Sequence, residues 1–162
     1  MEQVDTKSYE DATRKTYESN AAIITVELAE YHLNHLKRLY RAFNGDLLLP
    51  LILGEVGHFN LRGLDVSSVR NPLFENMHAL VKTRQACNTY SISLSLGLPR
   101  ETVRRKVAKL IDMGFLQRSG GRNLYITNRA VQEFVPEFNL ETFRLFLGAS
   151  QRISRITRGP NQ

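Results

Sequence analysis

The chain has 162 residues, 42% of them hydrophobic, which suits one domain or two small ones and excludes global disorder. Its single cysteine excludes a disulfide framework and a cysteine-rich zinc site and suits a reducing cytoplasm, and its longest apolar run, residues 47–53, is too short to span a membrane. The net charge is +6, but residues 84–129 hold 9 Lys or Arg against 2 Asp or Glu, and such a confined excess indicates a polyanionic partner.

The N-terminal residues 1–20 are polar, show no periodicity and lack the apolar core of a signal peptide. We expect a mobile arm here, or a helix that only a partner orders. From residue 22 to residue 43, apolar side chains recur in alternating steps of four and three, which predicts a helix with an apolar seam. The seam packs either on another helix of the same protomer or on a second copy. Its members are Ala22, Val26, Ala29, Leu33, Leu36, Tyr40 and Phe43.

A second helix follows a glycine stop. Asn44-Gly45 can end the first helix, because Gly readily takes the left-handed conformation, and Asp46 can cap a helix over residues 47–60. This helix is apolar nearly all round, so we expect it to be central and buried. Its last polar residues, His58 and Asn60, either line a pocket for a small-molecule effector between two domains or satisfy the polar groups of the helix end.

Residues 61–71 contain glycine and paired serines without a period, which makes them the best candidate for a domain boundary. Asn71-Pro72 is a helix start signal, since Asn can cap and Pro fits the first helical position. We therefore predict a packing or dimerisation region in residues 21–70 and a second domain in residues 71–135. The buried face of the new helix would hold Leu73, Met77, Leu80 and Val81.

The most informative stretch combines a short amphipathic helix over residues 90–96, a tight turn, and a basic helix over residues 100–113 that stops at Gly114. Gly97 supplies the positive φ that a steep crossing of two helices needs. The spacing buries an apolar set between the helices: Leu96, Leu98, Val103, Val107 and Leu110. It leaves a mainly basic set facing outward: Arg100, Glu101, Arg104, Arg105 and Lys109.

These outward side chains have the chemistry of a DNA-reading surface. In the major groove, Arg can bond guanine bidentately and Glu can accept a hydrogen bond from cytosine. Exposed N–H groups at helix N-termini favour phosphate, and several hydroxyls lie near such termini: Thr89, Tyr90, Ser91 and Thr102. The alternative is an ordinary solvated basic helix face.

A β-hairpin is predicted next, with apolar stretches at residues 116–118 and 124–127 on either side of Gly120-Gly121. Arg122 at its tip and Arg118 beside the tip fit a contact with the minor groove or with phosphate. The alternative is a plain hairpin whose arginines only add solubility.

Residues 136–162 predict a last helix and a basic tail. We expect Asn128 to cap a helix over residues 129–135, Pro136 to break the chain, and Asn139 to cap the last helix. The apolar positions of that helix suggest docking onto the N-terminal helices across a dimer. They are Leu140, Phe143, Phe146, Leu147 and Ile153.

The run LGLPRETVRRKVAKLIDMGFLQR, within residues 84–129, resembles bacterial winged-helix transcription regulators of the Crp, GntR and MarR types. It is similar to the Crp-type recognition helix in particular, whose Arg-Glu-Thr-Val run matches residues 100–103. The resemblance implies a winged helix-turn-helix and base contacts from Arg100, Glu101 and Arg105. One departure is Pro99, which stands where those helices often have a capping Ser or Thr.

Other chemistry is weakly signalled. His32 and His35 are spaced three apart on a helix, but no further ligand is obvious, so we predict no metal and no cofactor. Cys87 is either a redox sensor or a small core residue. The sequence contains no GxSxG, P-loop or HExxH motif, so we do not expect an enzyme.

Together these patterns predict a mainly α protein with a small β-hairpin wing, that is, a winged helix-turn-helix with flanking N- and C-terminal helices. We expect a bacterial, cytoplasmic and nucleoid-associated homodimer that binds double-stranded DNA and regulates transcription. The recognition helix, about residues 99–113, would lie in the major groove, and the wing, residues 116–127, on the minor groove or the backbone. The alternative is a winged-helix protein-interaction module without DNA binding, and neither function involves a membrane.

Overall fold

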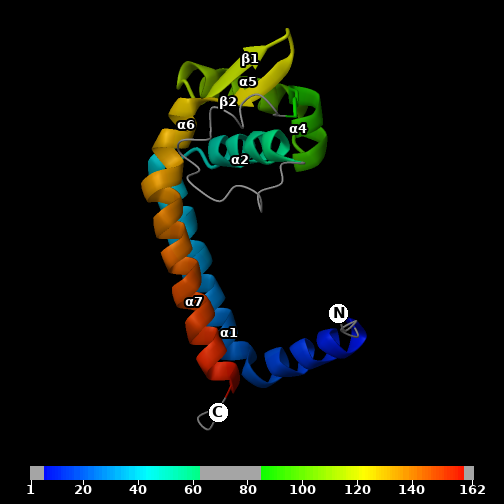
Figure 1. Ribbon diagram of the computed structural model, residues 1–162, viewed down its shortest axis with the longest axis vertical. Helices are drawn as coiled ribbons and strands as arrows, with labels where there is room; N and C mark the ends of the chain where they lie inside the picture. The colour runs from blue at the N-terminus through cyan, green and yellow to red at the C-terminus, as the bar shows by residue number, and fades with distance from the viewer. Residues whose placement is uncertain (1–5, 63–84, 159–162) are drawn as a thin grey trace, which may run out of the picture. The chain divides into compact units, whose positions relative to one another are not determined.

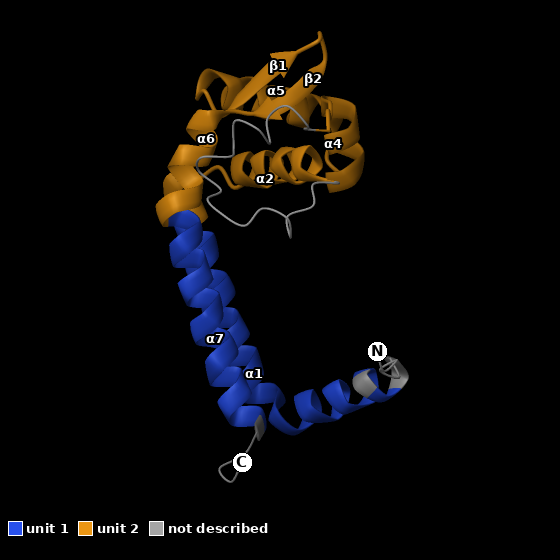
Figure 2. Cartoon of the chain, viewed as in Figure 1, with its two compact units in different colours: residues 1–38, 138–162 blue, residues 39–137 orange. Residues whose placement is uncertain are grey.

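The computed structural model describes residues 6–62 and 85–158 of the chain (Figure 1). The described residues are mainly helical and contain one two-stranded antiparallel sheet, as the sequence predicts. They fall into two compact units, which Figure 2 colours separately: residues 1–38 with 138–162, called unit 1, and residues 39–137, called unit 2. The predicted helix at residues 71–81 and most of the predicted boundary at residues 61–71 lie outside the described ranges.

The first helix, α1 (Thr6–Ala42), is longer than the predicted one and has a single kink, at Asn20. The sequence left open whether the first residues form an arm or a helix, and residues 6–19 are helical. After α1, Asn44 and Gly45 have φ angles of 50° and 85°, so the predicted helix stop is confirmed. The predicted apolar seam does not pack on another helix of the same protomer. Phe43 is its only buried member.

Unit 1 pairs α1 with the C-terminal helix α7 (Leu140–Arg158), which runs beside it in Figure 1. The two helices are antiparallel, because Glu27 contacts Arg152 whereas Arg38, later in α1, contacts Thr142, early in α7. The C-terminal helix therefore docks onto the N-terminal one within a single protomer. Of the predicted docking residues, Phe146 contacts the Tyr31 ring of α1, yet it stays largely exposed, as do Leu140, Phe143 and Leu147.

The segment before α7 corrects three predictions. A short helix α6 (Asn128–Glu133) passes through a π-helical turn η1 (Phe134–Asn139) straight into α7, so Pro136 does not break the helical chain. A π-turn shifts hydrogen bonding to the fifth residue, which can accommodate a residue that lacks an N–H group. Asn139 consequently ends a π-turn instead of capping α7. Thr127, and not Asn128, caps α6, because its Oγ1 accepts a hydrogen bond from the Ala130 N–H at 3.2 Å.

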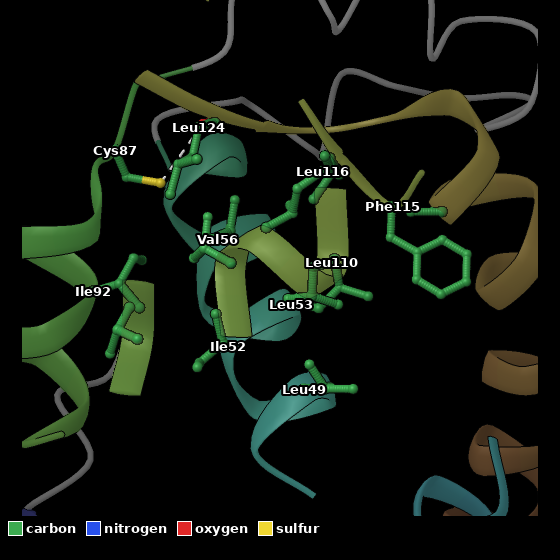
Figure 3. Close-up of a cluster of buried hydrophobic side chains, with 14 of the residues drawn as sticks. Leu49, Ile52, Leu53, Val56, Cys87, Ile92, Leu110, Phe115, Leu116 and Leu124 are labelled. Carbon is green, nitrogen blue, oxygen red and sulfur yellow. Dashed lines mark hydrogen bonds between the residues drawn. The ribbon is translucent and has the colours of Figure 1, made fainter. Parts of the chain in front are cut away.

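Unit 2 is built around α2 (Leu48–Leu61), which packs against α4 (Thr89–Leu96), α5 (Arg100–Asp112) and the strand β2 (Asn123–Ile126). Figure 3 shows the buried cluster that these elements share. Its fully buried side chains include Leu49, Ile52, Val56, Ile92, Val103, Val107, Leu110 and Leu124. The helix is central, as predicted, but only one side of it is buried, because Leu51 is 48% and Leu61 is 44% exposed.

The grouping of α2 differs from the predicted domains. The sequence placed residues 47–60 in an N-terminal region of residues 21–70, whereas α2 belongs to the same compact unit as α4, α5 and the hairpin. The physical reason is that the buried side of α2 packs on α4, α5 and β2, whose own apolar faces need a partner. Burying such a helix in unit 2 completes one contiguous core, which neither predicted domain could form alone.

Asp46 does not cap α2 with its side chain, contrary to the prediction, and Leu47 occupies the N-cap position without a side-chain hydrogen bond. The Asp46 carboxylate instead accepts a hydrogen bond from Lys106 Nζ at 2.6 Å, and Lys109 Nζ lies 3.6 Å away. Burial alone would raise the pKa of Asp46, but the hydrogen bond from Lys106 and the two lysine charges lower it below its ordinary value. This ionised carboxylate ties the start of α2 to α5.

The hairpin consists of β1 (Leu116–Ser119) and β2, antiparallel and in register from Leu116 opposite Ile126 to Ser119 opposite Asn123. Gly120 and Gly121 at the tip have positive φ angles, as the sequence predicts for a glycine pair in a tight turn. Cys87 forms an isolated antiparallel bridge with Leu124, so the segment before α4 also pairs with β2.

Asn60 anchors the hairpin to α2. Its side chain is fully buried, donates to the carbonyls of Gln85 and Leu124 at 2.9 and 3.2 Å, and accepts from the Ile126 N–H at 2.9 Å. A buried amide satisfied in this way is a structural clamp. The sequence left open whether His58 and Asn60 line an effector pocket or satisfy polar groups at the helix end. The hydrogen bonds of Asn60 favour the second interpretation.

Candidate nucleic-acid interface

The N-terminus of α4 is held by a reciprocal cap that the sequence analysis missed. Asn88 Oδ1 accepts hydrogen bonds from the N–H groups of Tyr90 and Ser91 at 2.9 and 3.0 Å, while Ser91 Oγ accepts from the Asn88 N–H at 3.0 Å. This is a capping box with Asn at the cap and Ser three residues later, a signal that the spacing Asn88–Ser91 could have revealed. Ser91 was predicted as a phosphate contact, but its hydroxyl is used by the cap.

A steep turn brings the start of α5 beside the start of α4. Gly97 has a φ of 63°, as predicted, and its left-handed conformation ends α4. Pro99 occupies the N-cap position of α5 without a side-chain hydrogen bond, also as predicted. The buried Ser93 donates a hydrogen bond to the Leu98 carbonyl at 2.7 Å, which fixes the turn. The first residues of both helices therefore lie on one side of unit 2.

Tyr90 and Arg100 join the two helix starts directly. The guanidinium carbon of Arg100 lies 4.0 Å from the centre of the Tyr90 ring, a cation–π contact. Both side chains are exposed. Stacking restricts the rotamers of Arg100 while leaving its N–H groups available to an acceptor, so the contact orients a cationic donor toward solvent.

Glu101 and Arg104 form a second pair on the same face of α5. Arg104 Nε and Nη2 donate to the two carboxylate oxygens of Glu101 at 2.8 and 2.7 Å. The hydrogen bonds from Arg104 lower the pKa of Glu101 and raise that of Arg104, so both groups are charged at neutral pH. The pair is exposed, with 63% of each side chain accessible, so it is open to exchange with an incoming anion.

These residues and the hairpin arginines line one surface hollow of about 630 Å³. Four arginines and one glutamate supply its charge, which gives a net positive surface beside the capped end of α4. Seven of the eleven predicted site residues meet here, together with Asn88. The lining residues are Asn88, Thr89, Tyr90, Arg100, Glu101, Arg104, Arg118 and Arg122.

Four predicted site residues do not line the hollow: Ser91, Thr102, Arg105 and Lys109. Arg105 is exposed on α5, as the helical spacing predicts, and Thr102 is half-buried. Lys109 is exposed too, but its ammonium group lies next to Asp46. The outward orientation of the α5 set is thus confirmed, but the set divides between two places. Some members line the hollow, and Lys109 lies beside Asp46.

The histidines of α1 and Cys87, the other residues considered as sites, are packed against neighbouring side chains. His35 stacks on Tyr31, and its pKa is lowered by burial and then by the charges of Arg38 and His32. No cluster of three or more metal-ligating side chains occurs among the described residues. Cys87 is 3% exposed, and burial, aided by the charge of Glu55, raises its pKa to about 11, as expected of a core thiol. Within residues 6–62 and 85–158, no helix has the length and hydropathy to cross a membrane.

Comparison with known proteins finds no matching family model, no matching curated protein and no matching solved structure. The functional argument therefore rests on the chemistry of the hollow. Guanidinium groups in a fixed fork geometry are suited to phosphate and to base edges that accept hydrogen bonds. Several of them on one rigid surface, around exposed helix starts, can bind an extended polyanion.

Proposed function

We propose that this chain is a sequence-specific DNA-binding regulator of transcription with a winged helix-turn-helix in unit 2. The observation that carries the proposal is the convergence of Arg100, Arg104, Arg118 and Arg122 from α5 and the hairpin on one hollow. In the proposed complex α5 occupies the major groove and the hairpin contacts the minor groove or the backbone.

The local architecture supports this assignment. The fully buried face of α5, with Val103, Val107 and Leu110, holds the helix on the core and leaves its opposite face to solvent. The hairpin begins two residues after Gly114, which ends the C-terminal turn of α5, and Asn60 clamps it to α2. Both positively charged elements are therefore fixed on one rigid unit, as a groove-binding surface requires.

Each residue of the hollow has a proposed role. Arg100, oriented by Tyr90, and Glu101 contact bases, and Arg104 exchanges Glu101 for a phosphate or a base edge. Thr89 contacts the backbone through its hydroxyl, since side-chain hydroxyls help to position a protein on the duplex. Arg105, exposed on α5 but outside the lining of the hollow, contributes a further base or phosphate contact.

The test measures binding to a fluorescent 25-base-pair duplex by anisotropy over a range of salt concentrations. Removing two phosphate contacts with Arg118→Ala plus Arg122→Ala should reduce the slope of log K against log salt by about 1.8, at about 0.9 per contact. Arg144→Ala plus Arg155→Ala on α7 removes the same charge from exposed sites in unit 1 and should leave the slope unchanged.

Two results would contradict the proposal. An absence of duplex binding at low salt would favour the protein-interaction module without DNA binding. An equal loss for both pairs of substitutions would mean that only net charge matters and that the hollow has no special role.

A further inference from the structure

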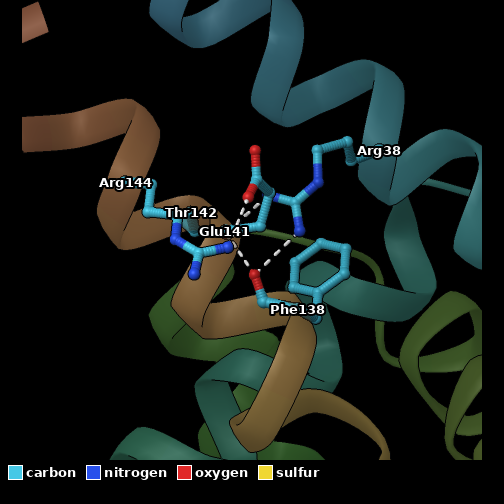
Figure 4. A network of polar contacts seen from close by, with 5 residues as sticks. All are labelled: Arg38, Phe138, Glu141, Thr142 and Arg144. Atoms are coloured by element: carbon cyan, nitrogen blue, oxygen red, sulfur yellow. Dashed lines mark hydrogen bonds and ion pairs between the residues drawn. The ribbon is translucent and has the colours of Figure 1, made fainter. Parts of the chain in front are cut away.

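Unit 1 has polar contacts as well as buried Ile24 and Ala149 between its two helices, but much of the apolar surface of α1 stays exposed. Arg38 of α1 donates to Thr142 Oγ1 at the start of α7 at 2.9 Å and to the Phe138 carbonyl of η1 at 2.8 Å (Figure 4). Further along, Arg152 Nε donates to Glu27 at 2.5 Å. A pair of helices that stood alone in water would be expected to keep fewer large apolar side chains exposed.

The outer face of α1 carries the apolar stripe here called the α1 seam: Ala22, Val26, Ala29, Leu33 and Leu36. Val26 is 63% exposed and Leu33 is 53% exposed. The seam points away from α7, because Tyr31, which contacts Phe146 of α7, is two residues from Leu33 and hence about 200° around the helix. No part of α7 covers it, and a sustained seam of this kind normally packs on another helix.

We infer that the α1 seam is a homodimer interface, formed by two copies of α1 packed antiparallel about a twofold axis near Leu33. A second copy suits the seam because a twofold interface needs a surface that is complementary to itself. The charges beside the seam have this property.

Glu30 and Lys37 flank the seam on the same side, one heptad apart, and both are exposed. In an antiparallel pair centred near Leu33, Glu30 of one copy lies opposite Lys37 of the other, and the symmetry makes this contact twice. Parallel, in-register copies would instead place Lys37 beside His32 of the second copy and Glu30 beside Thr25. Charges at these flanking positions set partner choice and orientation in helix pairs.

The apolar layers and the helix dipoles agree with the antiparallel arrangement. The central layer joins Leu33 of one copy to Leu36 of the other, again twice, so the largest aliphatic side chains of the seam meet in the middle. Antiparallel helices also place the positive end of each macrodipole beside the negative end of its neighbour.

The first test is the mass of the nuclease-treated full chain in solution, measured by sedimentation equilibrium. We expect a dimer, and Leu33→Asp should weaken dimerisation on the order of a hundredfold, because it removes two buried leucines per dimer. Leu28→Asp is the matched control: Leu28 is 40% exposed on the same helix but lies off the seam, and its replacement should leave the dimer intact. A monomeric wild type, or equal effects of the two substitutions, would overturn the inference.

A charge exchange tests the orientation without threatening the fold. Lys37→Glu places like charges opposite each other twice and should weaken the dimer about tenfold, and adding Glu30→Lys should restore it. If the double variant stays as weak as the single one, the antiparallel arrangement is wrong. Because both tests are made without nucleic acid, their outcome is independent of the DNA-binding proposal.

Discussion

Glu101 offers the sharpest test of how the hollow works. Its carboxylate holds two N–H groups of Arg104 at 2.7 and 2.8 Å, so the free protein keeps one of its four hollow arginines neutralised. The hydrogen bonds from Arg104 lower the pKa of Glu101, so Glu101→Gln removes a full negative charge at neutral pH with almost no change in shape. We predict that this substitution increases the affinity for duplex DNA of arbitrary sequence.

The magnitude follows from counting contacts. Releasing Arg104 adds about one phosphate contact, which should steepen the salt slope by about 0.9 and raise affinity on the order of tenfold at 0.1 M salt. Anisotropy with an unrelated 25-base-pair duplex measures both quantities. Glu133→Gln is the matched control, because Glu133 is exposed in unit 2 but does not line the hollow. Equal effects of the two substitutions, or a loss of affinity with Glu101→Gln, would refute the reasoning.

Three further predictions concern the units themselves. Asn60→Ala removes three hydrogen bonds of a buried side chain and should lower the free energy of unfolding of unit 2, measured in urea, by about 2–4 kcal/mol. A change below about 0.5 kcal/mol would contradict the clamp. The native Cys87 thiol, with its pKa raised to about 11, should react with iodoacetamide at pH 8 about a hundredfold more slowly than the unfolded chain, and equal rates would disprove its burial. Because the pKa of His35 is lowered in the folded chain, this residue stabilises the fold at pH values above about 6.5, the ordinary pKa of histidine. That stabilisation should be lost as the pH falls through the lowered pKa of the folded state. His35→Gln should abolish that pH dependence of urea unfolding and His58→Gln should not.

Several features of unit 2 could be predicted because each depends only on residues close together in the sequence. The stop at Gly97, the buried spacing of Val103, Val107 and Leu110, and the glycine pair of the hairpin each depend on a few adjacent residues. Backbone sterics and helical periodicity settle such features before any tertiary contact forms. The same reasoning predicted which side chains of α5 are exposed.

Features that depend on distant residues were missed. Asp46 is a residue type that often caps helices, but Lys106, 60 residues later, offers its carboxylate a charged partner. Nothing near Pro136 indicates that a π-turn continues the helix through it. The periodicity of α1 predicted a helix with an apolar stripe, and the helix is present, yet periodicity cannot tell which neighbour a helix selects, and α7 packs on the opposite face.

The candidate site was predictable in its residue types but not in its pairings. The sequence identified the arginines of α5 and the hairpin, and helical spacing correctly placed the former outward. It could not show that Arg100 stacks on Tyr90, that Glu101 neutralises Arg104, or that Lys109 lies beside Asp46. These contacts depend on how α4, α5 and α2 cross, which the packing of the core determines.

The most direct test of the central claim is selection of binding sites for the full chain from a library of random duplex DNA. Sequence-specific recognition by α5 predicts that repeated rounds enrich a defined motif, and that Arg100→Ala alters the enriched sequence at particular positions. If the chain retains DNA without enriching any sequence, or retains none at low salt, the proposed function is wrong.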